Sequence, residues 1–229
     1  MSKPKSIVLL SAGLDSTVNL YMAQNDTEVV QTVTFNYGQK AANKEIEKAK
    51  DLSDHLKINH LVIDLPWLKN LGNSALTSDQ LKIPTGKQVV IDHLETSKRT
   101  AQSVWVPNRN GVFLNIAAAV AEGLKAQVVV PGFNLEEATT FPDNSYEFIR
   151  ATRKTFAFST QNHVDVQCYT VSLTKNEIVD KAKTLLVPFD KIWPCYFGFD
   201  RWCGECESCQ RAKRAFKANH VDVLGNFAK

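Results

Sequence analysis

The fold is decided near the N-terminus by the stretch Ile7-Val8-Leu9-Leu10-Ser11-Ala12-Gly13-Leu14-Asp15-Ser16-Thr17. Its first four residues are apolar, which is typical of a buried parallel strand, and Ser16 and Thr17 are residue types that cap a helix. Backbone N–H groups at a helix N-terminus lack intrahelical partners and lie at the positive end of the helix dipole, so they bind phosphate. The stretch therefore predicts a strand, a phosphate-binding loop and a helix. The alternative is an ordinary turn whose polar residues only cap the helix.

The loop differs from the two commonest phosphate-binding motifs. A Walker loop has Lys before its Ser or Thr, a dinucleotide loop has three spaced glycines, and neither pattern occurs in the chain. The stretch instead resembles the S-G-G-x-D-S loop of the PP-loop ATP pyrophosphatases, which split ATP between its α and β phosphates. Ala12 stands where that family usually has a second Gly, and a positive φ there would strain it by about 1 kcal/mol. The resemblance implies ATP binding by Leu10, Ser11, Ala12, Gly13, Leu14, Asp15, Ser16, Thr17, Val18, Asn19 and Leu20.

Length and composition favour a globular protein with one large core and a small appendage. The chain has 229 residues, of which 44% are hydrophobic and 22% charged. Its 27 basic and 24 acidic residues are interspersed, so we expect no basic surface that grips nucleic acid. The first apolar run stops after Leu10, and we expect neither a signal peptide nor a membrane span. A cytoplasmic location follows, in which five cysteines favour metal binding over disulfides.

Strand and helix signals alternate along the first half of the chain. A β-branched run predicts a strand at 29–35, a helix follows from residue 42, and residues 61–64 form a third strand. Further strands are expected at 127–131 and 164–171. This alternation predicts an α/β fold, a doubly wound parallel sheet with right-handed crossovers. Ligands bind such sheets at the carboxyl ends of the strands.

The chain divides into two expected parts. Residues 1–190 form the PP-loop ATP-binding α/β domain, and residues 191–229 form a C-terminal zinc-binding tail with a terminal helix. Residues 70–103 are polar and contain Gly72, Pro84 and Gly86, so we expect an insertion without regular structure. Such a long segment is either a surface insertion or an active-site lid, and the sequence favours neither.

Two cations are expected at helix starts near the carboxyl edge. Arg109 precedes a helix at 112–124, where it could clamp a phosphate or pair with an acid at the surface. Lys175 lies in Thr174-Lys175-Asn176-Glu177, a capping box that opens another helix, and it could also meet phosphate.

Polar and aromatic residues follow the strand at 127–131. Carboxylates such as Glu137 could accept the N–H groups of a guanine-like ring, or could simply open a helix. Phe141 and Asp143 lie on a turn fixed by Pro142, where the ring could stack on a planar base and the carboxylate could pair with its amino edge. Phe141 as a filler of the core is the alternative.

The strongest chemical signal is the set Cys195, Cys203, Cys206 and Cys209. Four thiolates saturate a tetrahedral zinc ion, so the spacing predicts a structural site that holds the tail to the sheet. An iron–sulfur cluster is the alternative, although the usual Cys before Pro is missing downstream. The fifth cysteine, Cys168, lies in an apolar run and is expected to be buried.

The ordered set of motifs resembles the 7-cyano-7-deazaguanine synthase family of queuosine biosynthesis over nearly the whole chain. The matching segments are Ser11 to Ser16, Tyr37 to Gln39, Val106 to Asn110, Gly132 to Asn134, Phe141 to Asp143, Leu173 to Ile178, Cys195 with Tyr196, and Cys203 to Arg211. The departures are Ala12, Phe141 for the usual Tyr, and Asn144-Ser145 for a frequent Cys-Arg. The last two lie in the expected base pocket.

The resemblance implies a ligase that forms carbon–nitrogen bonds. It would convert 7-carboxy-7-deazaguanine and ammonia to 7-cyano-7-deazaguanine through adenylated intermediates, with ATP as substrate, Mg²⁺, and one structural Zn²⁺. The partners implied are these small molecules and a second copy in a homodimer, with no membrane and no required nucleic acid. The residues implied are Asp15, Ser16, Arg109 and Lys175 for catalysis, Asn134, Glu137, Phe141 and Asp143 for substrate, and the four cysteines of the C-terminal tail for metal.

Two other functions remain open from the sequence. A PP-loop enzyme of another specificity, such as a tRNA thiolase or a ligase acting on a protein or nucleotide, would share the loop. Thiolation would need a mobile cysteine pair outside the zinc site, where only Cys168 is available. A zinc-containing nucleic-acid-binding module is the second alternative, suggested by a basic tail that is more typical of a solvated helix face. Its cations are Arg201, Arg211, Lys213, Arg214 and Lys217.

Overall fold

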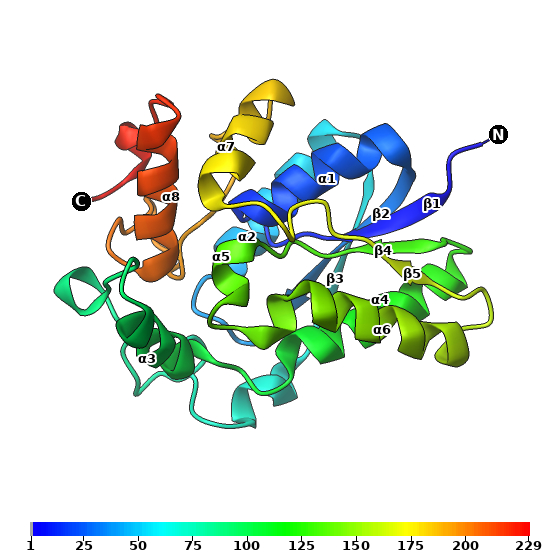
Figure 1. The fold of residues 1–229 in the computed structure, drawn as a ribbon, viewed down its shortest axis with the longest axis horizontal. Coiled ribbons are helices and arrows are strands. Elements are labelled where there is room, and N and C mark those ends of the chain that lie inside the picture. The colour runs from blue at the N-terminus through cyan, green and yellow to red at the C-terminus, as the bar shows by residue number, and fades with distance from the viewer. Residues whose placement is uncertain (1) are drawn as a thin grey trace.

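Five parallel strands form the sheet at the centre of the molecule (Figure 1). The structure is a computed structural model and describes residues 2–229. The order across the sheet is β3-β2-β1-β4-β5. The strands are β1 (Lys5–Leu9), β2 (Glu28–Asn36), β3 (Asn59–Asp64), β4 (Val128–Val130) and β5 (Asp165–Val166). This arrangement confirms the predicted doubly wound α/β fold.

Helices cover both faces of the sheet. Helices α1 (Leu14–Asp26) and α2 (Ala42–His55) lie on one face, and α4 (Arg109–Gly123) and α6 (Tyr146–Ser159) lie on the other (Figure 1). Adjacent strand residues point to opposite faces, so Val8 packs in a cluster with Leu20 and Leu52, while Ile7 packs in a cluster with Leu114. Because both faces are covered, β4 and the Ile7–Leu9 part of β1 are continuous apolar runs rather than alternating ones.

The direction of the chain reverses between β1 and β4. The chain runs outward from β1 to β2 and β3, then returns to place β4 on the other side of β1. The loops that follow β1 and β4 therefore diverge and leave a crevice at the carboxyl ends of these strands. Gly132, just after β4, lies so close to α1 that a Cβ there would be 2.6 Å from the backbone nitrogen of Ser16. Only glycine fits this approach of two backbones.

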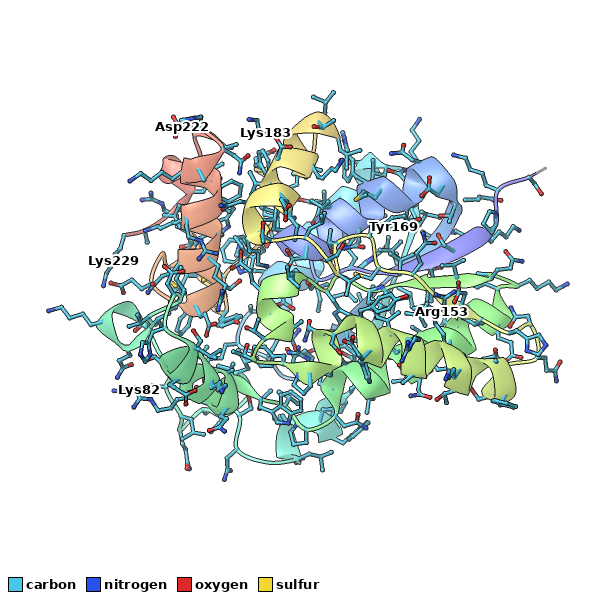
Figure 2. The ribbon with its side chains drawn as sticks, in the orientation of Figure 1. Lys82, Arg153, Tyr169, Lys183, Asp222 and Lys229 are labelled. Atoms are coloured by element: carbon cyan, nitrogen blue, oxygen red, sulfur yellow. The ribbon has the colours of Figure 1, made fainter. Side chains whose placement is uncertain are left out.

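The C-terminal segment packs against the α/β layers and shares a hydrophobic cluster with them. Helices α7 (Lys175–Thr184) and α8 (Glu207–Ala218) lie side by side, and Nζ of Lys183, labelled in Figure 2, donates to the carbonyl of Asn219 at 3.0 Å. One hydrophobic cluster joins Val18 of α1, Ile178 of α7 and Phe216 of α8. Residues 191–229 thus share a core with the expected first domain, and the boundary at residue 190 stays a prediction.

Two predicted boundaries were wrong. Helix α1 begins at Leu14 after the N-cap residue Gly13, so Ser16 and Thr17 lie in its first turn and do not cap it. Their hydroxyls instead donate to the carbonyl of Gly13, at 3.2 Å and 2.8 Å. The fifth strand has only two residues, because the chain leaves the sheet and the Tyr169 amide donates to Asn19 of α1 at 2.8 Å.

The expectation of no regular structure over 70–103 was also wrong in part. A 3₁₀ turn covers Pro66–Asn70, another covers Gly86–Gln88, and α3 (Leu94–Val104) is a full helix. Helix α3 is mostly polar, and Ala101 and Val104 are buried on one face of it.

No helix among residues 2–229 is long and apolar enough to cross a membrane.

Candidate active site

A cavity of about 240 Å³ opens at the carboxyl ends of β1, β2 and β4. The loop after β1 contributes Ser11 to its lining, the first turn of α1 contributes Asp15, and Gly132 lines it from the end of β4. Helix α4 contributes Arg109, and the C-terminal segment contributes Tyr196. The cavity therefore lies at the switch point that the topology creates, between a helix N-terminus and several charged side chains.

The loop after β1 is held in an unusual backbone conformation. Ala12 has φ of 57°, the left-handed region, which confirms the positive φ anticipated for this position. The carbonyl of Ala12 accepts a hydrogen bond at 2.7 Å from the backbone of Trp193, in the C-terminal segment. Ser11 donates its backbone N–H to Oγ of Ser16 at 3.3 Å, which closes the loop over the first turn of α1.

Three charged side chains form a buried cluster beside this loop. Nζ of Lys175 contacts Oδ2 of Asp15 and lies 3.0 Å from Oε1 of Glu137. Burial acts to lower the pKa of Lys175, but the two carboxylates outweigh it and raise that pKa. Burial likewise acts to raise the pKa of Glu137, and Lys175 with Arg211 lowers it. Lys175 and Glu137 are therefore both charged at neutral pH.

One oxygen of this cluster lacks a partner. Among the described residues, no hydrogen bond reaches Oδ1 of Asp15, although this atom is buried and its residue lines the cavity. Burial raises the pKa of Asp15, and Lys175 opposes that rise. The ammonium of Lys175 lies between the carboxyl groups of Asp15 and Glu137. The free carboxylate oxygen in that setting fits a ligand of Mg²⁺.

Arg109 occupies the far side of the cavity. Its Nη1 donates to Oη of Tyr37 at 3.2 Å, and its guanidinium lies 5.7 Å from the centre of the Tyr37 ring. Phe113 lies 6.0 Å away on the same side. Arg109 is thus a half-buried cation within the cavity rather than a surface residue, and its role as a phosphate clamp stays a prediction.

Glu45 is a cavity residue that the sequence analysis missed. It lies in the first turn of α2, lines the cavity, and accepts a hydrogen bond from Nε2 of Gln39 at 2.8 Å. Burial raises the pKa of Glu45 to about 7, against opposing effects of Gln39 and Arg109. The amphipathic pattern of the helix marks which face is apolar, but it does not show that a polar residue of the first turn faces the crevice.

The predicted substrate residues divide into two pairs. Glu137 and Phe141 line the cavity, and Phe141 stacks on Trp105 with ring centres 6.1 Å apart. Asn134 is fully buried, donating to Asp15 at 3.0 Å and accepting the backbone N–H of Glu137 at 2.9 Å, so it supports the cluster. Asp143 is absent from the lining, whereas its neighbour Asn144 is part of it.

The other predicted residues divide in the same way. All four predicted catalytic residues, Asp15, Ser16, Arg109 and Lys175, line the cavity. Of the stretch predicted to bind ATP, Leu10, Ser11, Gly13, Leu14, Asp15 and Ser16 line it, whereas Ala12, Thr17, Val18, Asn19 and Leu20 do not. These last five residues are fully buried. Ala12 adopts the positive φ of the loop, and the other four are packed residues of α1. Direct binding by these five residues stays a prediction.

The four cysteines of the C-terminal segment come together. The sulfur atoms of Cys195, Cys203, Cys206 and Cys209 all lie within 4.8 Å of one another, and all four residues are buried. Backbone N–H groups point to two of these sulfurs: Phe197 and Cys203 donate to Cys195 at 3.4 and 3.3 Å, and Glu205 and Cys206 donate to Cys203 at 3.4 and 3.3 Å. Such donors stabilise thiolates, so the set fits one metal ion.

Comparison with known proteins places the chain in a family. The family model described as queuosine biosynthesis protein QueC matches residues 5–220. The chain belongs to the QueC family. A relative from Bdellovibrio bacteriovorus, named 7-cyano-7-deazaguanine synthase, is 56% identical over 97% of both chains. One of the same name from Carboxydothermus hydrogenoformans is 49% identical over 94% of this chain and 99% of its own. Among solved structures, NMN synthetase from Francisella tularensis has a TM-score of 0.49 and 15% identity, over 98% of this chain and 80% of that one.

Several of the QueC-like motifs surround the cavity. The C-terminal segment, which the sequence analysis treated as an appendage, contributes Trp193, Cys195, Tyr196 and Ser208 to the lining. The short cysteine spacing could not predict this contribution to the lining, because the spacing indicates a metal site and does not indicate which surface the segment covers. The cysteine cluster therefore borders the cavity.

Proposed function

We propose that this protein is an ATP-dependent ligase that converts 7-carboxy-7-deazaguanine and ammonia to 7-cyano-7-deazaguanine. The observation that carries the proposal is the buried cluster of Asp15, Lys175 and Glu137 beside the helix-start loop, in a chain of the QueC family. The names of its relatives support the choice of substrate.

ATP would bind with its pyrophosphate on the loop after β1. The backbone N–H groups at the start of α1 and the hydroxyls of Ser11 and Ser16 would contact the phosphates. The substrate carboxylate is a poor electrophile, so its oxygen would attack the α-phosphorus, and pyrophosphate would leave. Lys175 and Arg109 would neutralise charge that develops on the phosphates. No enzyme nucleophile is needed, so catalysis would rest on positioning and electrostatics.

Ammonia would then attack the carbonyl carbon of the acyl adenylate. AMP leaves with the original carboxylate oxygen, and the product is an amide. A second ATP would activate the amide oxygen in the same way, and loss of AMP and a proton would give the nitrile. The same cavity serves both steps, because each step places an oxygen nucleophile against an α-phosphate.

Mg²⁺ would bind at the free Oδ1 of Asp15 together with phosphate oxygens. When bound, the ion would offset the negative charge of the transferred groups. Oδ2 of the same carboxylate is held by Lys175 and by Asn134, so the free oxygen has a fixed direction. Asn134 would therefore contribute by orienting Asp15.

Zinc would be structural. Cys195, Cys203, Cys206 and Cys209 would saturate a tetrahedral ion, which leaves no open position for water or substrate. Zinc is favoured over an iron–sulfur cluster because the usual fourth Cys before Pro is missing from the sequence. Colourless protein with about one zinc per chain is the expected result of elemental analysis. Brown protein containing iron would contradict this assignment.

The base of the substrate would lie against Phe141, with Glu137 of the cavity wall at its amino edge, or with Asp143, which would have to turn into the cavity. Of the four predicted substrate residues, Phe141 supplies an aromatic ring to the cavity wall, and this ring stacks on Trp105. Asp143→Asn should weaken binding of the deazapurine far more than binding of ATP, which calorimetry with each ligand measures. Equal losses for the two ligands would show that Asp143 only supports the turn.

Thiolation is a less favoured function for this site. Cys168, the only cysteine outside the four-cysteine cluster, lies near the backbone of Phe133, and burial raises the pKa of its thiol. A nucleophilic cysteine needs the opposite shift.

The proposal also includes homodimeric assembly, which light scattering would test, and a cytoplasmic location, which suits the use of ATP and of reduced cysteines.

The decisive experiment is incubation of the full chain with ATP, Mg²⁺, ammonium and 7-carboxy-7-deazaguanine, followed by mass spectrometry. The expected products are the nitrile, AMP and pyrophosphate. The matched control uses 7-deazaguanine, which has the same ring system but no carboxylate and should yield no AMP. Formation of ADP and phosphate, or absence of the nitrile, would overturn the proposal.

A further inference from the structure

Two neighbouring carboxylates of α5 (Leu135–Ala138) bind Lys175, one at its side-chain ammonium and the other at its backbone N–H. Glu137 contacts Nζ at 3.0 Å, and Oε1 of Glu136 accepts the backbone N–H of Lys175 at 2.9 Å. Lys175 is the first residue of α7, so Glu136 caps that helix at the residue whose ammonium contacts Asp15. The place of the ammonium group therefore depends on the place of Glu136.

Glu136 is itself held by two arginines of α8. Nη1 of Arg211 donates to Oε2 of Glu136 at 2.9 Å, and Arg214 contacts the same oxygen. Arg211 is buried, with 6% of its side chain exposed, and it also forms two bonds to Glu207 at 2.8 and 3.2 Å. Arg214 is 32% exposed and shares its charge with Asp92 at the surface. Solvent screens the Arg214 pair, so Arg211 makes the stronger connection.

Helix α8 begins inside the four-cysteine cluster. Cys206 is its N-cap residue, Cys209 lies in its first turn, and Arg211 follows two residues later. A metal ion on the cysteines would fix this first turn. Helix α8 joins Cys209 to Arg211, and hydrogen bonds continue from Arg211 through Glu136 to the backbone of Lys175.

We propose that Arg211 is a positioning residue, which sets the location of Lys175 through Glu136 and so couples the metal-binding segment to the ATP site. This inference rests on the function proposed above, and it assigns a role to the arginine that ends the cysteine-rich motif. Arg211 is not part of the cavity lining and binds Glu136, so it acts through Glu136. Misplacement of a charged group by about 1 Å can reduce turnover by about 100-fold.

The test compares Arg211→Gln, Arg211→Lys and Glu136→Gln with the control Arg214→Gln, all in the metal-loaded full chain. Arg214 lies one turn further along the same helix and contacts the same oxygen, which makes it a matched control. Three quantities are measured for each variant: the metal content, the kcat and the KM for ATP, and the hydrogen exchange rate of the Lys175 backbone amide.

We expect Arg211→Gln and Glu136→Gln to lower kcat by about 10- to 100-fold, with the KM for ATP changed less than about threefold and one metal retained per chain. The Lys175 amide should exchange at least about 10-fold faster in both, because its acceptor is no longer held. Arg211→Lys keeps the charge and should recover part of the kcat. Arg214→Gln should lower kcat by less than Arg211→Gln does, because solvent screens the contact of Arg214 with Glu136. The double variant Arg211→Gln/Glu136→Gln should lose no more than either single one, since both act on one connection.

Full turnover in Arg211→Gln would overturn the proposal. So would an equal loss in Arg214→Gln, or a loss of turnover that only follows loss of metal, because the arginine would then merely support the fold. If the wild type makes no nitrile, the proposed function fails, and the exchange rate of the Lys175 amide still decides whether Arg211 positions this residue. An unchanged exchange rate in a folded Arg211→Gln protein excludes the connection.

Discussion

Glu45 is a half-buried carboxyl group in the cavity wall, and its environment makes the free energy of unfolding depend on pH. Burial raises its pKa from 4.5 to about 7, so the folded state holds a proton there that the unfolded state releases. The stabilisation from this group is complete below the unfolded pKa and is lost as pH rises from about 4.5 to about 7. We expect Glu45→Gln, which stays neutral, to gain about 1 to 3 kcal/mol in unfolding free energy relative to the wild type between pH 4.5 and pH 8.

Urea unfolding of both proteins at several pH values measures this difference. The matched control is Glu47→Gln, at an exposed position on the same helix that pairs with Lys44. A difference between Glu45→Gln and the wild type that is constant with pH would show that folding does not raise the pKa of Glu45.

The second prediction for a single residue concerns the charge of Asp15. Asp15→Asn keeps the shape of the side chain and removes the charge that pairs with Lys175. Turnover should fall by at least about 100-fold, because the side chain at position 15 no longer contributes its charge to stabilising the transition state at the phosphate loop. Glu137 still pairs with Lys175, so the melting temperature should change by only a few degrees. Steady-state kinetics and calorimetry of the same sample test both parts. Turnover equal to the wild type would contradict the role of Asp15.

At the scale of elements, the loop after β1 depends on two small residues for different reasons. Ala12 adopts φ of 57°, which strains any residue with a Cβ. Ala12→Gly should therefore raise stability by about 0.5 kcal/mol, since the relief of strain exceeds the added flexibility of the unfolded chain. Gly132→Ala should do the reverse, because its Cβ would lie 2.6 Å from the backbone of Ser16. Thermal melts with and without ATP compare the two variants. Equal melting temperatures for Gly132→Ala and the wild type would exclude the close approach.

At the scale of the whole molecule, the cysteine cluster should stabilise the entire fold. Its residues share one hydrophobic cluster with α1 and α7, so loss of the metal should disturb the wall of the cavity as well as the C-terminal segment. Cys206→Ser should lower the stability by several kcal/mol and reduce metal content, because metal binding supplies folding energy. The serine variant Cys168→Ser, outside the cluster, is the control and should retain the metal. Elemental analysis and melting curves measure both effects. A Cys206→Ser protein of undiminished stability would contradict a structural metal.

The sequence by itself determined the sheet, the loop after β1 and the cysteine set. Each depends on neighbours in the chain: an apolar run, small residues before a helix, or ligands at short spacing. The capping box at Thr174 and Glu177 was predicted for the same reason and is present.

Only the tertiary structure decided which polar residues meet. Lys175 lies 160 positions from Asp15, and Arg211 lies 75 positions from Glu136. No local pattern encodes such pairs, because they depend on how α5, α7 and α8 pack at the edge of the sheet. Glu45 was missed for this reason, and Tyr196 was recognised only as part of a motif: whether a polar residue faces water or a cavity is set by elements distant in the chain. The short β5 and the helix α3 have the same cause, since contacts with α1 and the buried face of α3 outweigh local propensity.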